Sequence, residues 1–177
     1  MQELLDAYEN CETNKCIVPT TESSFFVVDS TSKRSEIQLS NTTPEYPHFS
    51  FTNTQNKQLS LICVDECIFF GQDGKKCDFA IHDETFFCFI ELKRGLGKNE
   101  ILKSENKDKA INQLINTITA FSSVIDFNTR FSRTEAYACI GYDTCVPQCI
   151  SQDLHMTKLF WNRFRIHLQE GNHKKFS

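Results

Sequence analysis

Apolar residues gather into short runs in the middle of the chain, and polar turns separate them. The runs LSLICVDECIFF, KCDFAIH and FFCFIELK are rich in β-branched and aromatic residues, which is typical of β-strands. GQDG separates the first two runs, and DET forms a tight connection between the last two. We therefore predict three consecutive strands over residues 59–70, 76–82 and 86–93.

The pattern then changes from a strand period to a helical one. Residues 94–109 are polar and Lys-rich, so a loop is predicted, and residues 109–121 place their apolar side chains on one broad face of a helix. A buried strand is expected over 134–142 and a closing helix over 155–169. The order strand, strand, strand, helix, strand, helix predicts an α/β fold with a mixed central sheet, flanking helices and at least one crossover helix.

The residues before this region are more polar and carry weaker signals. A short helix is predicted over 2–10, a hairpin over 23–41, and a loop with two prolines over 41–58. We accordingly predict an N-terminal extension over residues 1–56 and a core domain over residues 57–177.

Composition adds three expectations to this outline. The 177 residues include 16 Phe and 1 Trp, so a Phe-rich core is expected. No apolar run is long enough to cross a bilayer, and the first residues lack the pattern of an export signal. We therefore predict a cytoplasmic protein without a membrane partner, whose nine cysteines are reduced thiols. Cys145 and Cys149 are better explained as small buried side chains than as half of a zinc site.

Charge is distributed unevenly along the chain. Residues 1–92 hold 6 Lys/Arg against 15 Asp/Glu, and residues 93–177 hold 13 against 8, within a net charge of −4. An acidic half followed by a basic half is a weak indication of a polyanionic partner.

Three charged residues lie inside the apolar runs. A two-residue turn flanked by Asp83 and Phe86 would place Asp78 opposite Glu91 on one sheet face, with Lys93 two residues further on the same face. Opposed carboxylates repel each other, so we expect Mg²⁺ or Mn²⁺ between them. A lysine beside such a site would orient water or stabilise negative charge. This set predicts attack of water on a phosphodiester, and the alternative is a plain Asp78–Lys93 salt bridge.

Cys77-Asp78 followed by Glu91-Leu92-Lys93 resembles the PD-(D/E)xK nuclease superfamily, which has the restriction-endonuclease-like fold. The resemblance covers residues 59–143. It implies Mg²⁺-dependent cleavage of nucleic acid, with metal bound by Asp78, Glu91 and the backbone carbonyl of Leu92. It also implies that Lys93 is the catalytic lysine.

The resemblance has one further candidate and two departures. Some members carry a glutamine on the next helix that points toward the site, and Gln113 is the candidate, with a solvated glutamine as the alternative. Cys77 stands where the motif has proline. Many members also use an acidic residue from a preceding helix. The acidic candidates for that role are Glu3, Asp6, Glu9 and Glu66.

Phosphate contacts are expected from the basic residues that follow the motif. Those chosen are Arg94, Lys98 and Lys103, and the C-terminal region adds Lys158, Arg163, Arg165, Lys174 and Lys175. The leading interpretation is a metal-dependent nuclease in defence, restriction or repair, which acts on DNA ahead of RNA and works as a homo-oligomer or within a larger complex. The alternatives are a catalytically weak nuclease-like module that binds nucleic acid or protein, and a structural protein with an accidental match.

Overall fold

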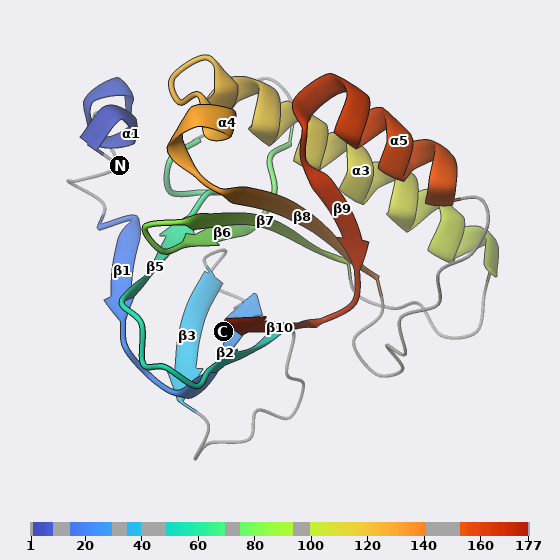
Figure 1. The fold of residues 1–177 in the computed structure, drawn as a ribbon. Coiled ribbons are helices and arrows are strands. Elements are labelled where there is room, and N and C mark those ends of the chain that lie inside the picture. The colour runs from blue at the N-terminus through green and yellow to red at the C-terminus, as the bar shows by residue number, and fades with distance from the viewer. Residues whose placement is uncertain are drawn as a thin grey trace.

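The computed structural model describes residues 2–8, 15–29, 35–39, 49–69, 75–93, 100–140 and 153–176. The helices are α1 (Gln2–Ala7), α3 (Glu100–Ser122), α4 (Phe127–Arg130) and α5 (Asp153–Phe164). The strands are β1 (Ile17–Thr20), β2 (Ser24–Asp29), β3 (Ser35–Leu39), β4 (Phe49–Asn53), β5 (Leu59–Cys63), β6 (Phe79–His82), β7 (Phe86–Lys93), β8 (Arg133–Ile140), β9 (His167–Glu170) and β10 (His173–Phe176). Figure 1 shows these elements along the chain.

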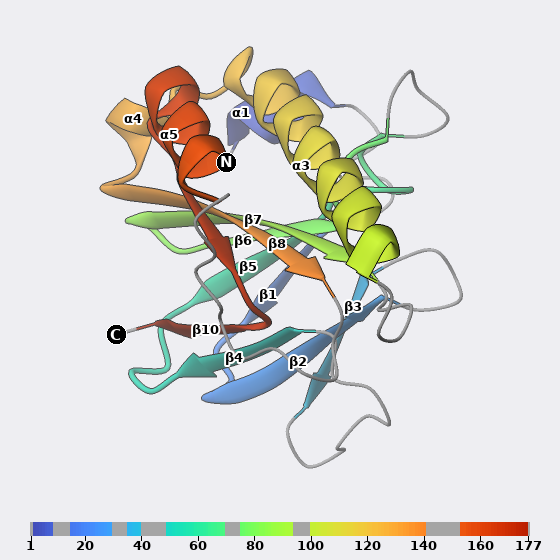
Figure 2. The same ribbon diagram turned by 90° about the vertical axis from the view of Figure 1, so that its right-hand side faces the viewer.

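The strands form two sheets that lie on top of each other. The six-stranded sheet has the order β1-β5-β6-β7-β8-β9, and the four-stranded sheet has the order β10-β4-β2-β3. Strands β1, β5, β6 and β7 pair in antiparallel fashion, whereas β7, β8 and β9 are parallel to one another. Helices α3 and α5 make the parallel crossovers and cover one face of the larger sheet, while the smaller sheet covers the other face (Figures 1 and 2). The predicted mixed α/β architecture with flanking helices is confirmed.

Aromatic side chains fill the space on both faces of the larger sheet. On the face toward the smaller sheet, the Phe49 ring lies 6.3 Å from Phe79 and 5.3 Å from Tyr137. On the helical face, the Phe89 ring lies 5.8 Å from Phe121 of α3. Because β7 is covered on both faces, its sequence is an almost continuous apolar run rather than an alternating one. The expected Phe-rich core is confirmed.

Several predicted boundaries need correction. The hairpin of β2 and β3 is present, but the predicted loop over 41–58 contains β4. Helix α3 begins at Glu100 inside the predicted loop, because Glu and Lys residues there are good helix formers. The predicted closing helix ends at Phe164, where Arg165 adopts a φ of 60°, and the chain continues as β9.

Strand pairing connects the two predicted segments. Strand β1, which precedes residue 56, pairs with β5 in the larger sheet, and β10 near the C-terminus pairs with β4 in the smaller one. The predicted boundary at residue 56 therefore does not separate one sheet from the other.

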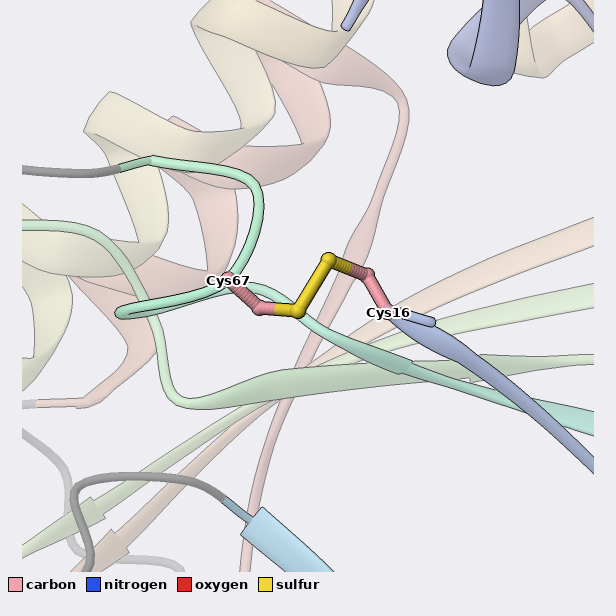
Figure 3. The surroundings of a disulfide bond; sticks show 2 residues. All are labelled: Cys16 and Cys67. Atoms are coloured by element: carbon pink, nitrogen blue, oxygen red, sulfur yellow. A yellow bond between two sulfur atoms is a disulfide. The ribbon is translucent and has the colours of Figure 1, made fainter. Parts of the chain in front are cut away.

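A disulfide joins Cys16, just before β1, to Cys67 in the turn that follows β5 (Figure 3). The prediction of reduced thiols was therefore wrong for this pair, which becomes close in space only when β1 pairs with β5. The other cysteines within the described segments are buried thiols, namely Cys63, Cys77, Cys88 and Cys139. Cys11, Cys145 and Cys149 lie outside the described residues. No helix in those segments is long and apolar enough to cross a membrane.

Candidate functional site

The β6–β7 hairpin has the predicted register. Ile81 pairs with Cys88, and the ladder extends to Phe79 opposite Ile90, so the same register brings Asp78 level with Glu91. Asp83 fixes the turn, since its Oδ1 accepts hydrogen bonds from the backbone N–H of Thr85 and of Phe86, both at 2.7 Å. The predicted position of Asp78 opposite Glu91 depends on this turn, and Asp83 stabilises the geometry of the turn.

Asp78 is held from two sides by backbone groups. Its Oδ2 accepts a hydrogen bond of 2.6 Å from the N–H of Leu92, and its carbonyl accepts one of 3.1 Å from the N–H of Val64. Val64 directly follows β5, whereas Leu92 belongs to β7. The Asp78 side chain thus lies at the end of β6, fixed between the two neighbouring strands.

Glu91 is the most unusual charged group of the sheet. Its side chain is fully buried, and its Oε1 accepts a hydrogen bond from Lys93 Nζ. Its Oε2 has no hydrogen-bond partner among the described residues. Burial first, and the Asp78 carboxylate second, raise the pKa of Glu91 well above its usual value, and Lys93 offsets part of this effect.

Lys93 lies at the end of β7 with its side chain one-fifth exposed. Its ion pair is with Glu91, its neighbour on the same face of the strand, rather than the Asp78–Lys93 pair that the plain structural alternative predicted. A buried carboxylate with one neutralising cation and one unsatisfied oxygen is costly for stability. Glu91 is therefore a candidate for a chemical role.

Asp65 is a third acidic residue near this site, and the sequence analysis missed it. Its backbone N–H lies 3.4 Å from the carbonyl oxygen of Asp78. Burial raises the pKa of Asp65, with a further contribution from Glu66, and the charge of Lys93 lowers it. Asp65 in turn contributes to the raised pKa of Glu91. The charge of Asp65 therefore interacts with those of Glu91 and Lys93 in the hairpin.

The predicted strand over residues 59–70 explains why Asp65 was missed. Strand β5 ends at Cys63, and the chain then turns, with the N–H of Ile68 donating to the carbonyl of Val64 at 3.1 Å. Glu66, the residue that the sequence analysis considered, has a φ of 54° within this turn. An acidic pair that interrupts an apolar run was the available signal, because it is a poor fit for a central strand.

Helix α3 holds the segment that leads into Asp78. Gln113 is buried rather than solvated, and its Nε2 donates a 2.7 Å hydrogen bond to the carbonyl of Lys76. Thr117, one turn further along α3, accepts a 2.7 Å hydrogen bond at Oγ1 from the N–H of Cys77. In this structure Gln113 therefore positions the backbone beside the candidate site.

Only some of the residues predicted to contact phosphate lie within the described segments. Arg94 and Lys98 lie outside the described residues, and Lys103 lies on α3 without a described side chain. Of the suggested acidic partners, Glu3 and Asp6 are exposed on α1, and Glu9 lies outside the described residues. Lys174 has a different task, because its Nζ lies 2.7 Å from Oε2 of the buried Glu135.

Glu135 provides an internal comparison for Glu91. It lies on β8, the strand next to β7, and its side chain is 1% exposed. Its two oxygens are both paired, Oε1 with Arg133 at 2.6 Å and Oε2 with Lys174 at 2.7 Å. Both glutamates are buried, but only Glu135 has a partner for each of its oxygens, whereas Oε2 of Glu91 has none among the described residues.

Asp78 and Glu91 are the residues of this site that could hold a metal ion. Among the residues that the structure describes, no three His, Cys, Asp or Glu side chains converge as a ready-made cage for a metal ion. Asp78 and Glu91 supply opposed carboxylates, and the unsatisfied Oε2 of Glu91 is an available oxygen donor of the kind that Mg²⁺ and Mn²⁺ prefer. Comparison with known proteins gives no further guidance, since no protein-family model, curated protein or solved structure matches this chain.

Proposed function

We propose that this chain is a metal-dependent nuclease with a restriction-endonuclease-like core, which hydrolyses phosphodiester bonds of nucleic acid. The observation that carries the proposal is the buried Glu91, whose unsatisfied Oε2 lies on the strand opposite Asp78. Such a group reduces stability unless a ligand completes it. DNA is expected ahead of RNA as the substrate.

The arrangement of the strands supports the same reading. Strands β5, β6 and β7 form an antiparallel meander, α3 follows, and β8 returns parallel to β7. This is the order that the sequence resemblance implies for the core of these nucleases, with the charged residues on its second and third strands.

The residues present fit a divalent cation held by Asp78, Glu91 and the carbonyl of Leu92. When bound, such a cation polarises the scissile phosphate and lowers the pKa of a water nucleophile. Asp78 and Glu91 orient the site, and Lys93 lies beside them, paired with Glu91. Lys93 then stabilises the negative charge that develops on the phosphate. Gln113 and Thr117 keep the backbone before Asp78 in place from α3.

A nucleic-acid-binding or protein-binding module without catalysis is the second candidate. It is favoured by the Lys93–Glu91 ion pair, which already neutralises one charge of the site. It is also favoured by the absence of a convergent three-residue cage in the described segments.

Cleavage and metal binding together test the proposal. Plasmid, linear duplex, single-stranded DNA and RNA are incubated with Mg²⁺, Mn²⁺ or chelator, using wild type, Asp78→Asn and Lys93→Met. The matched control is Glu84→Gln, which makes a similar change at an exposed position in the same hairpin turn. We expect metal-dependent cleavage by wild type and control, and none by the two site variants.

Thermal unfolding with and without Mn²⁺ gives a readout that does not depend on turnover. Mn²⁺ is expected to raise the melting temperature of the wild type and not that of Glu91→Gln. Metal binding without cleavage of any substrate would favour the binding module. Neither binding nor cleavage in folded protein would reject the proposal.

A further inference from the structure

The outward side of α5 and the start of β9 carry an unusual group of exposed side chains. Trp161 is the only tryptophan of the chain and is 41% exposed, although large aromatic side chains are usually mostly buried. Leu154 on the same helix is 57% exposed. We call this surface the α5–β9 face, and its exposed residues are Leu154, His155, Lys158, Trp161, Asn162, Arg163, Arg165 and His167.

The His167 ring and the Arg165 guanidinium pack against the Trp161 ring. The His167 ring lies 4.8 Å from it at an interplanar angle of 39°, and the Arg165 guanidinium lies over it, 5.5 Å from the ring centroid. Arg165 reaches this position because its φ of 60° ends the helix and turns the chain back along it. The ring is therefore kept in one orientation while two-fifths of its residue remains accessible.

The charge of this face is of one sign. The sequence from Leu154 to Gln169 contains three Lys/Arg, two His and no acidic residue, although the whole chain has a net charge of −4. Several other cations of the described segments are paired with carboxylates, such as Lys107 with Glu170 and Lys174 with Glu135. No carboxylate of the described residues pairs with the three cations of the α5–β9 face, which are Lys158, Arg163 and Arg165.

The face also lies on the same sheet as the candidate site. His167 at the start of β9 is level with Glu135, whereas Glu170 at its end is level with Ala138, which in turn pairs with Glu91. Three residues along a strand and two strand spacings separate the backbones of His167 and Glu91, which is roughly 14 Å, and the odd offset places their side chains on opposite faces of the sheet. Strand β9 is the edge of this sheet, so a nucleic-acid strand that reaches both residues passes around that edge.

We propose that the α5–β9 face binds single-stranded nucleic acid, with one base stacked on Trp161 and backbone phosphates on Lys158 and Arg165. Unpaired bases stack on exposed aromatic rings, whereas bases in a duplex are already stacked on each other. Basic side chains around such a ring follow the phosphate backbone. The inference rests on the proposed nuclease function and names its substrate as single-stranded.

The single tryptophan makes the test direct. Wild type is titrated in chelator with oligothymidylate, with oligouridylate and with a duplex, and the fluorescence of Trp161 is recorded. We expect saturable quenching by the single strands and much weaker quenching by the duplex. With the two phosphate contacts of Lys158 and Arg165, the logarithm of the binding constant should fall with log salt at a slope of about −1.4.

Variants are measured by the anisotropy of a labelled oligonucleotide, because Trp161→Ala has no tryptophan signal. Trp161→Ala is expected to weaken binding about tenfold or more, and Trp161→Phe less, since it keeps an aromatic plane. Arg165→Gln should reduce the salt slope by about 0.7. Arg130→Gln, the same loss of charge at an exposed position of α4, is the matched control and should bind like wild type. Circular dichroism verifies the fold of each variant.

The outcomes separate this inference from the nuclease proposal. Quenching without metal-dependent cleavage supports the α5–β9 face and rejects the nuclease, whereas cleavage without quenching does the opposite. Preference for the duplex, or a Trp161→Ala variant that binds like wild type, overturns the inference. Stronger quenching by oligothymidylate than by oligouridylate identifies DNA as the strand, and the reverse order identifies RNA.

Discussion

Two buried glutamates on neighbouring strands should respond to the same substitution with opposite signs. Glu91→Gln removes a charge whose Oε2 has no hydrogen-bond partner in the described structure, and whose only recorded partner is the one-fifth exposed Lys93. Glutamine keeps a polar group at this position, but it removes a buried charge that the Asp78 carboxylate repels, a cost of about 1–3 kcal/mol. The ion pair with Lys93 returns only part of this, so we expect the variant to be more stable by about 1 kcal/mol.

Glu135→Gln should have the opposite effect. Both oxygens of Glu135 are paired, and the substitution leaves Lys174 without its carboxylate although the lysine side chain is only 14% exposed. Removing one partner of a buried ion pair costs about 3–5 kcal/mol. Because the Arg133 side chain is 56% exposed and regains water, we expect a loss near the lower end, about 3 kcal/mol.

Urea unfolding at pH 7 in the presence of chelator measures both differences. Equal slopes of the free energy of unfolding against urea would show that the two variants unfold as the wild type does. If Glu91→Gln is destabilised as strongly as Glu135→Gln, Glu91 is a structural ion-pair partner. The argument that its burial serves chemistry would then be refuted.

Three other changes give distinct signatures. Thr117→Val should destabilise the fold by about 1–3 kcal/mol and lower the cleavage rate, because the buried N–H of Cys77 loses its acceptor. Urea unfolding and a cleavage assay check this, and an unchanged stability together with an unchanged cleavage rate would contradict it. Burial lowers the pKa of His82 from 6.5, so the unfolded chain takes up this proton first as the pH falls, and stability should drop below about pH 6.5 until the folded pKa is reached. Melting temperatures between pH 7.5 and about pH 5 should show a flatter dependence in His82→Phe, and parallel curves would contradict the assignment. Cys16 and Cys67 are 51 residues apart, so reduction of their disulfide should lower the free energy of unfolding by up to about 4 kcal/mol. Calorimetry with and without reductant measures this loss, and Cys16→Ser should reproduce it in the absence of reductant.

The local pattern of the sequence was sufficient for the centre of the fold. The turn chemistry of Asp83 and the alternation along β6 and β7 determine the register, so the position of Asp78 relative to Glu91 followed from the sequence. The amphipathic pattern over 109–121 likewise identified the middle of α3. These features depend on residues close in sequence, which is why they were predictable.

Features that depend on distant contacts were not predictable in the same way. The Cys16–Cys67 bond requires β1 to join the edge of β5, and no local signal indicates that pairing. Strand β9 was predicted as the end of a helix because its one apolar residue, Leu168, also fits the helical period, and the φ of Arg165 decides between the two. Asp65 enters the site through a turn at the end of β5, where the sequence pattern indicated a continuous strand.

The departure at residue 77 has a structural consequence for the site. A proline there would have no N–H, whereas the N–H of Cys77 donates to Thr117, which itself donates to the carbonyl of Gln113. Gln113 also binds the carbonyl of Lys76, so α3 holds two consecutive residues immediately before Asp78. A rigid proline and a pair of hydrogen bonds from a helix achieve the same end, since each restricts the backbone that presents the aspartate. With Cys77 at this position, α3 therefore still holds the backbone that leads into Asp78.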